Sequence, residues 1–138
     1  MVILNPSFHT LDSAEANMKQ FDHEKLKVYH ATITFVAWVS DLLTGIPKSI
    51  SVHNQFDRAS TSIPLNIAEG NGKYTSADRC RFFDNARGSA LECAACLDVL
   101  VAKSLVEQTV AMEGKEMLIE IVSMLVGLIR SNSPCRDA

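Results

Sequence analysis

The sequence has no uncharged apolar run long enough to cross a membrane. Its two longest candidates, residues 28–40 and 121–129, fall short of the roughly 20 residues that a spanning helix needs. Residues 1–4 are apolar, but Asn5 and Pro6 end this run at once, so we expect no secretory signal. These absences predict a cytoplasmic protein without a membrane contact, in which the four cysteines remain free thiols.

The sequence also has no excess of positive charge. It carries 13 Lys and Arg against 16 Asp and Glu, which gives a net charge of -3. A strongly basic balance would indicate nucleic-acid binding over a broad surface, and this composition argues against it while leaving a local basic patch open. Apolar residues make up 47% of the 138-residue chain, which favours one well-packed domain over a disordered segment.

No alternating strand pattern, internal repeat or low-complexity segment is visible, whereas helical periodicity is frequent. We expect an irregular leader over residues 1–21, a bundle domain over 22–131 and a C-terminal tail over 132–138. Short connections between long helices predict an all-α fold, an antiparallel up-down-up-down four-helix bundle. The helices are predicted at residues 23–43, 50–69, 76–102 and 106–130.

Two sets of local signals refine this prediction. Thr75 with Asp78, and Ser104 with Glu107, each have the spacing of a capping box at the start of a helix.

Gly88 lies among small residues in the middle of its helix, and we expect another helix to approach closely there. The helices at 23–43 and 106–130 carry apolar residues on two faces, which favours self-association; the alternative is a monomer with deeply buried helices.

Catalytic and metal-binding patterns are missing. The segment 70–73 (Gly-Asn-Gly-Lys) resembles a phosphate loop, but Ile67 and Tyr74 occupy positions where that loop needs glycine and Ser or Thr. Cys93 and Cys96 lie one turn apart without further ligands nearby, so we expect core thiols rather than a zinc site. No histidine completes a Glu-x-x-His pair, and no serine has a nucleophile-elbow setting. We therefore expect no enzyme, cofactor or metal; the least favoured alternative is a carboxylate site at Glu69 and Glu92.

Polar residues in the second and third predicted helices are the main candidates for function. If these helices pack antiparallel, Glu69 comes within reach of Arg87, and Arg58 within reach of Glu92. Charges that face a bundle interior must be paired. Two interpretations stay open, an internal network that fixes helix register and a binding site.

One region of the sequence is locally basic. Three cations close to the turn between these helices are candidate phosphate contacts, although an ordinary solvated face explains them as well. They are Lys73, Arg79 and Arg81.

The segments 58–70 (RASTSIPLNIAEG) and 86–92 (ARGSALE) carry a resemblance to a known family. They resemble a four-helix bundle family named after proteins encoded in intervening sequences of bacterial 23S ribosomal RNA genes, and the likeness covers residues 22–131. The family name reflects gene location and does not imply a ribosomal subunit. The motif residues, expected to be structural or interface residues, are Arg58, Ser62, Asn66, Glu69, Arg87, Gly88, Ser89 and Glu92.

The resemblance implies a ring-like homopentamer. A similar protein is the accessory subunit of diversity-generating retroelements, which binds the reverse transcriptase and nucleic acid. That protein is basic and this chain is acidic, and Asp84 and Asn85 replace residues that are commonly apolar in the family. We therefore expect a non-catalytic homo-oligomeric scaffold whose partner is nucleic acid or a nucleic-acid enzyme. The alternative is an adaptor that binds proteins only.

Overall fold

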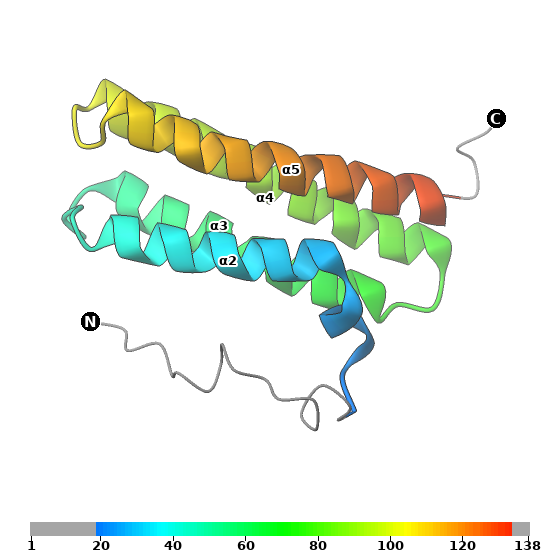
Figure 1. The fold of residues 1–138 in the computed structure, drawn as a ribbon. Coiled ribbons are helices and arrows are strands. Elements are labelled where there is room, and N and C mark those ends of the chain that lie inside the picture. Colours follow the sequence, from blue (N-terminus) through cyan, green and yellow to red (C-terminus); the bar gives the residue numbers. More distant parts are fainter. Residues whose placement is uncertain (1–18, 134–138) are drawn as a thin grey trace.

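The computed structural model describes residues 19–133, and within this range the chain forms helices joined by short connections. Four long helices are present, as the periodicity predicts. The first was expected to begin at residue 23, but a separate short 3-10 helix, η2 (Asp22–Lys25), occupies that position, and extended Leu26 separates it from the long helix. Figure 1 shows the long helices side by side, with the α3–α4 turn at one end and the other two connections at the opposite end. The long helices are α2 (Lys27–Leu43), α3 (Ser51–Asn71), α4 (Ser76–Ala102) and α5 (Gln108–Asn132).

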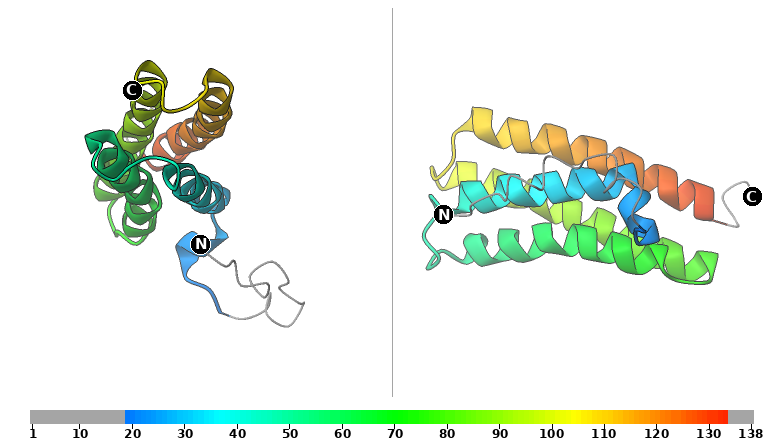
Figure 2. Two further views of the ribbon diagram at one scale, coloured as in Figure 1. Left: turned by 90° about the vertical axis from the view of Figure 1, so that its left-hand side faces the viewer. Right: turned by 60° about the horizontal axis from the view of Figure 1, so that its bottom comes forward.

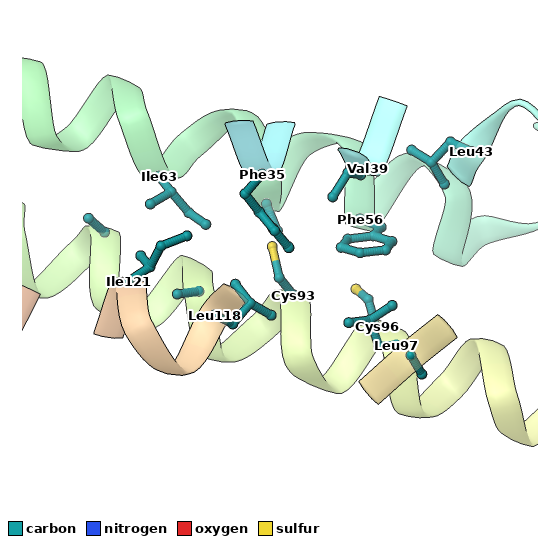
Figure 3. Close-up of a cluster of buried hydrophobic side chains, with 14 of the residues drawn as sticks. Phe35, Val39, Leu43, Phe56, Ile63, Cys93, Cys96, Leu97, Leu118 and Ile121 are labelled. Carbon is teal, nitrogen blue, oxygen red and sulfur yellow. The ribbon is translucent and has the colours of Figure 1, made fainter. Parts of the chain in front are cut away.

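The four long helices surround one apolar core. Helix α2 packs against α3 and α5, and α4 packs against the same two helices, so α2 and α4 lie on a diagonal (Figure 2). The largest fully buried side chains come from all four helices and include Phe35, Phe56, Leu97 and Ile121 (Figure 3). Their burial supplies the main stabilising contribution to the bundle.

Cys93 and Cys96 belong to this core, which agrees with the interpretation of both as packing residues (Figure 3). Burial raises the pKa of the Cys96 thiol to about 11, and burial raises the pKa of Cys93 as well. Both thiols therefore stay neutral near pH 7, as expected of side chains that pack in an apolar core. Within residues 19–133, no group of three or more His, Cys, Asp and Glu side chains is arranged to hold a metal ion.

The two predicted capping boxes have different outcomes. The Thr75 hydroxyl accepts a hydrogen bond from the Asp78 backbone N–H at 3.1 Å, which marks the start of α4 as predicted. The second capping box is wrong, because Ser104 has a φ of 59° and α5 begins only after Glu107. The Leu105 N–H instead bonds to the Leu100 carbonyl at 2.9 Å, so Ser104 takes the left-handed position that ends α4.

The close helix approach expected at Gly88 does not occur within the chain. A Cβ atom at Gly88 would meet nothing within 4 Å, because this residue lies on the exposed side of α4. The helices come close at two other glycines. A Cβ atom at Gly70 would lie 2.7 Å from the Cβ of Phe82, and one at Gly114 would lie 2.6 Å from the Trp38 ring.

The second apolar faces of α2 and α5 are partly exposed in the single chain. In α2, Phe35 and Val39 are buried, whereas Ile33 on the other stripe is only half-buried. In α5, Leu125 is buried and Ile119 is 69% exposed. The bundle therefore covers one face of each helix and leaves apolar surface at the other. Even so, none of the described helices is long and apolar enough to span a bilayer.

Candidate functional site

The motif residues lie on the surface of α3 and α4, and none belongs to the core. Four of them are exposed, namely Arg58, Glu69, Gly88 and Glu92. The other four are half-buried, namely Ser62, Asn66, Arg87 and Ser89. The four motif residues of α3 line a shallow groove of about 480 Å³. Leu65, which is 62% exposed, lines the same groove. The exposed charges Arg58, Glu69 and Glu92 are therefore not buried in the single chain, and a role of the motif residues in an interface stays a prediction.

A short hydrogen-bonded chain joins the two motif segments. The hydroxyls of Ser62 and Ser89 lie 2.9 Å apart and connect α3 to α4. The Asn66 amide donates to the Ser62 carbonyl and to its hydroxyl, both at 2.9 Å. These contacts fix the side chains at the floor of the α3 groove, so the groove has a defined polar lining.

The ion pairs that the sequence suggests between α3 and α4 are not formed within the chain. Glu69 pairs with Lys73 on its own helix at 4.0 Å, and Arg87 pairs with Asp84 at 2.9 Å. Partners three or four residues away on one helix are closer than partners on a neighbouring helix. Among residues 19–133, Arg58 makes no hydrogen bond or ion pair, and neither does Glu92.

Glu69→Ala is expected to change the free energy of unfolding of the chain by less than about 0.5 kcal/mol. The Glu69 side chain is 59% exposed and its one ion pair is long, so solvent screens most of that attraction. Urea titration at one protein concentration measures the change. A loss of several kcal/mol would show instead that the carboxylate is buried by contacts absent from the single chain.

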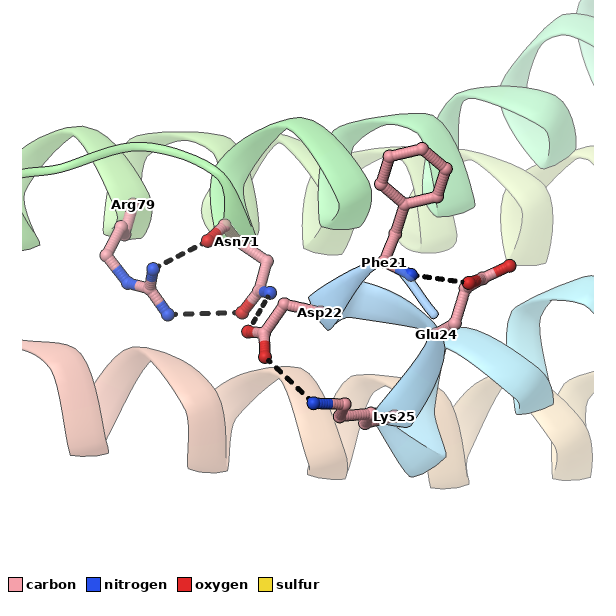
Figure 4. Close-up of polar contacts among 6 residues, drawn as sticks. All are labelled: Phe21, Asp22, Glu24, Lys25, Asn71 and Arg79. Atoms are coloured by element: carbon pink, nitrogen blue, oxygen red, sulfur yellow. Dashed lines mark hydrogen bonds and ion pairs between the residues drawn. The ribbon is translucent and has the colours of Figure 1, made fainter. Parts of the chain in front are cut away.

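A polar cluster at the α3–α4 end of the bundle contains Arg79. Its guanidinium donates to the Asn71 carbonyl at 2.7 Å, to the Asn71 side-chain oxygen at 3.1 Å, and to Asn132 at 2.9 Å. The Asn71 amide in turn donates to Asp22 at 2.8 Å, as Figure 4 shows. This cluster ties together α3, α4, the last turn of α5 and η2.

The sequence analysis missed Asn71, which is 8% exposed and central to this cluster. An asparagine between two glycines is typical of an ordinary turn. The only signal in the sequence for a buried contact is Arg79, a possible hydrogen-bond donor eight residues later. The guanidinium of Arg79 is engaged inside the chain, so it differs from the other two candidate phosphate contacts.

Lys73 and Arg81 flank one aromatic ring beside the α3–α4 turn. Each cation lies 5.0 Å from the centre of the Phe82 ring. Arg81 also pairs with Asp78 at 3.5 Å, and its side chain is 64% exposed. Tyr74 lies fully exposed in the turn itself. The end of the bundle therefore offers two accessible cations and an aromatic ring to a ligand.

A second groove, of about 430 Å³, runs between α4 and α5. Its lining is mainly apolar, and Leu91 and Ile119 are 51% and 69% exposed along it. Lys115 donates to Asp98 across the two helices at the edge of this groove. Asp98, Lys115 and Ser123 are the polar residues of its lining, and the remaining, apolar part suits an apolar side chain.

Comparison with known proteins places these features in context. Residues 24–127 match the family described as 23S rRNA-intervening sequence protein. A crystal structure of a protein of unknown function from the S23 ribosomal protein family of Bacteroides thetaiotaomicron has a similar fold, with a TM-score of 0.70 and 22% identity. The match covers 75% of this chain and 98% of that one. No curated protein matches the chain.

Proposed function

Because the chain belongs to the 23S rRNA-intervening sequence protein family, we propose that it is a non-catalytic, homo-oligomeric binding scaffold. In this proposal the antiparallel up-down-up-down bundle is the building block of a ring, which the resemblance of its motifs leads us to expect as a pentamer. The ring contacts nucleic acid or a nucleic-acid enzyme in the cytoplasm.

The observation that carries the proposal is the surface position of the motif residues. A core built from Phe35, Phe56 and Ile121 does not use the side chains of Arg58, Glu69 or Glu92. Charged groups that contribute nothing to the core can act in contacts with other molecules. The unpaired state of Arg58 and Glu92 in the single chain supports the same role.

The α3–α4 end supplies the features that favour nucleic acid as a partner. The half-buried Lys73 and the exposed Arg81 provide cations for phosphate groups, and the exposed ring of Tyr74 provides a surface on which a base can stack. A ring would repeat this small site once per copy, and repeated weak contacts give a much higher overall affinity.

The runner-up is an adaptor that binds only proteins, and the charges of the chain favour it. The net charge is -3, and both cations beside Phe82 have an acidic neighbour, Glu69 for Lys73 and Asp78 for Arg81. These carboxylates reduce the attraction for phosphate, which makes a measurement of RNA binding the deciding test.

We expect saturable binding of a labelled structured RNA, measured by fluorescence anisotropy, that weakens steeply as the salt concentration rises. Light scattering on the same sample gives the mass, which we expect to be a multiple of the 15.1 kDa chain. The double variant Lys73→Ala, Arg81→Ala is expected to lose at least ten-fold in affinity at low salt, because both phosphate contacts of each copy disappear.

The matched control is the double variant Lys48→Ala, Lys103→Ala, which removes the same charge from the opposite end of the bundle. It should bind RNA like the unmodified protein, apart from a small uniform loss from the change in net charge. Equal losses in both double variants would show that binding is non-specific. No binding at low salt would leave the protein adaptor as the function.

A further inference from the structure

Two surfaces of the chain carry exposed apolar side chains with complementary charges beside them. The α3 ridge is the outer face of α3, defined by Arg58, Ser62, Leu65 and Glu69, whose side chains also line the shallow α3 groove. Leu65 is exposed on this face between the two charges. The α4–α5 groove has an apolar part, defined by Ala90, Leu91, Ala94, Leu118, Ile119 and Val122, and a polar part made of Asp98, Lys115 and Ser123. We propose that the ridge of one copy docks in the groove of the next copy, so that the chain assembles head to tail. This inference rests on the proposed homo-oligomer and names its contact surfaces.

The apolar part of the contact is centred on three exposed side chains. Leu65 is 62% exposed on the ridge, and Leu91 and Ile119 are 51% and 69% exposed in the groove. Large apolar side chains exposed together in this way mark interaction sites on soluble proteins. Placing Leu65 between Leu91 and Ile119 removes all three from water, which is the usual centre of a protein interface.

The charged residues on either side of the apolar centre come opposite residues of the other sign when the two helices are aligned on Leu65 and Leu91. Arg58 lies seven residues before Leu65, and Asp98 lies seven residues after Leu91. When α3 of one copy runs opposite to α4 of the next, Leu65 opposite Leu91 therefore brings Arg58 to Asp98, about two helical turns away. Glu69 lies four residues after Leu65, and Arg87 lies four residues before Leu91, so these two also meet.

This register gives Arg58 the partner that it lacks in the single chain. Asp98 already accepts from Lys115, and Arg87 already pairs with Asp84, so each contact extends an existing ion pair into a small network. Opposite charges at both ends of an apolar centre fix orientation and exclude other registers. The pairing of Glu69 with Arg87, absent within the chain, is then made between copies.

A second copy fits the groove better than an unrelated protein because the chain itself supplies the matching surface. Ridge and groove are different surfaces, so the contact is heterologous and leaves one free ridge and one free groove at each step. The ridge lies on α3 and the groove on α4 and α5, and Figure 2 shows these helices around one bundle. Each added copy is therefore related to the one before it by the same rotation, and the proposed ring requires that this rotation closes after a whole number of copies.

The test uses two variants that each disable one surface, Leu65→Asp for the ridge and Ile119→Asp for the groove. Both side chains are more than half exposed, so each variant should fold and melt like the unmodified chain. Light scattering and native mass spectrometry should show each variant alone as a monomer. Mixing the two should give a dimer of twice 15.1 kDa, because one intact ridge then meets one intact groove.

Tyr74→Asp is the control, since it places the same charge on a fully exposed aromatic outside both surfaces and should leave the mass unchanged. A charge exchange provides a second test: Arg58→Asp and Asp98→Arg should each weaken assembly, and the double variant should restore it. If Leu65→Asp and Ile119→Asp keep the mass of an oligomeric unmodified protein, the docking is overturned while the proposed scaffold stands. If an equimolar mixture of Leu65→Asp and Ile119→Asp stays monomeric, the head-to-tail arrangement is overturned. An unmodified protein that is monomeric overturns both.

Discussion

Gly70→Val lowers the free energy of unfolding by about 3 kcal/mol, which we expect to be the largest effect of any substitution proposed for this chain. Gly70 is buried at the C-terminal end of α3, where that helix crosses the start of α4. A Cβ atom there would lie 2.7 Å from the Phe82 Cβ and 3.2 Å from the Arg79 carbonyl oxygen. Both atoms belong to or adjoin the α4 backbone, so the two helices would have to move apart.

Urea denaturation at one protein concentration measures this loss, because assembly would add a concentration-dependent contribution. Gly127→Val is the matched control, since a Cβ atom at Gly127 in α5 would meet nothing within 4 Å. The control should stay within about 0.5 kcal/mol of the unmodified chain. Equal stability of both variants would show that α3 and α4 separate easily at this end.

The helices could be predicted from the sequence because each carries a long apolar period and a marked start or stop. The α4 start is a clear case, since the Thr75 hydroxyl caps the Asp78 N–H. The α5 start was harder, because a serine can cap a helix start or occupy the turn after a helix end. The left-handed φ of Ser104 depends on the whole α4–α5 connection, which no local pattern describes.

Glycine roles were the least accessible from the sequence. Gly88 stands among small residues, yet the space around it is open, whereas Gly70 stands in a turn-like sequence and touches Phe82. The difference lies in the rotation of each helix about its axis. A small side chain is compatible with close packing or with solvent, and only the neighbouring helix decides between them.

The sequence identified the residues of the candidate site but did not predict how they are arranged in space. Arg58 and Glu69 were found because their segment resembles a family motif, and the structure adds that both lie with Leu65 on the exposed face of α3 that lines the shallow groove. Their expected partners on α4 were wrong for the single chain, since Arg87 pairs with Asp84 instead. Spacing alone does not distinguish a pair within the chain from a pair between copies.

The polar cluster at the α3–α4 end needed three-dimensional information. The contact between Arg79 and Asn132 joins residues 53 positions apart, and that between Asp22 and Asn71 joins residues 49 apart. No periodicity links such distant polar side chains. For this reason Arg79 was grouped with Lys73 and Arg81 as a cation of one region, although its contacts differ from theirs.

Arg79→Met is expected to lower the free energy of unfolding by about 2 kcal/mol. Methionine fills similar space but donates no hydrogen bond, so two Asn71 oxygens and the Asn132 side-chain oxygen lose their donor. Asn71 is 8% exposed, which leaves little room for water to replace the guanidinium. Arg81→Met, on an exposed side chain with one ion pair at 3.5 Å, should cost less than about 0.5 kcal/mol.

The same pair of variants separates a structural role of Arg79 from a role in binding. If Arg79 mainly holds α3, α4 and α5 together, Arg79→Met loses stability, and its RNA affinity measured well below the unfolding transition stays close to that of the unmodified protein. Arg81→Met should show the reverse, a stable chain with weaker RNA binding. Loss of RNA affinity in Arg79→Met without loss of stability would contradict the structural role, because a guanidinium committed to Asn71 and Asn132 cannot direct the same N–H groups at a phosphate.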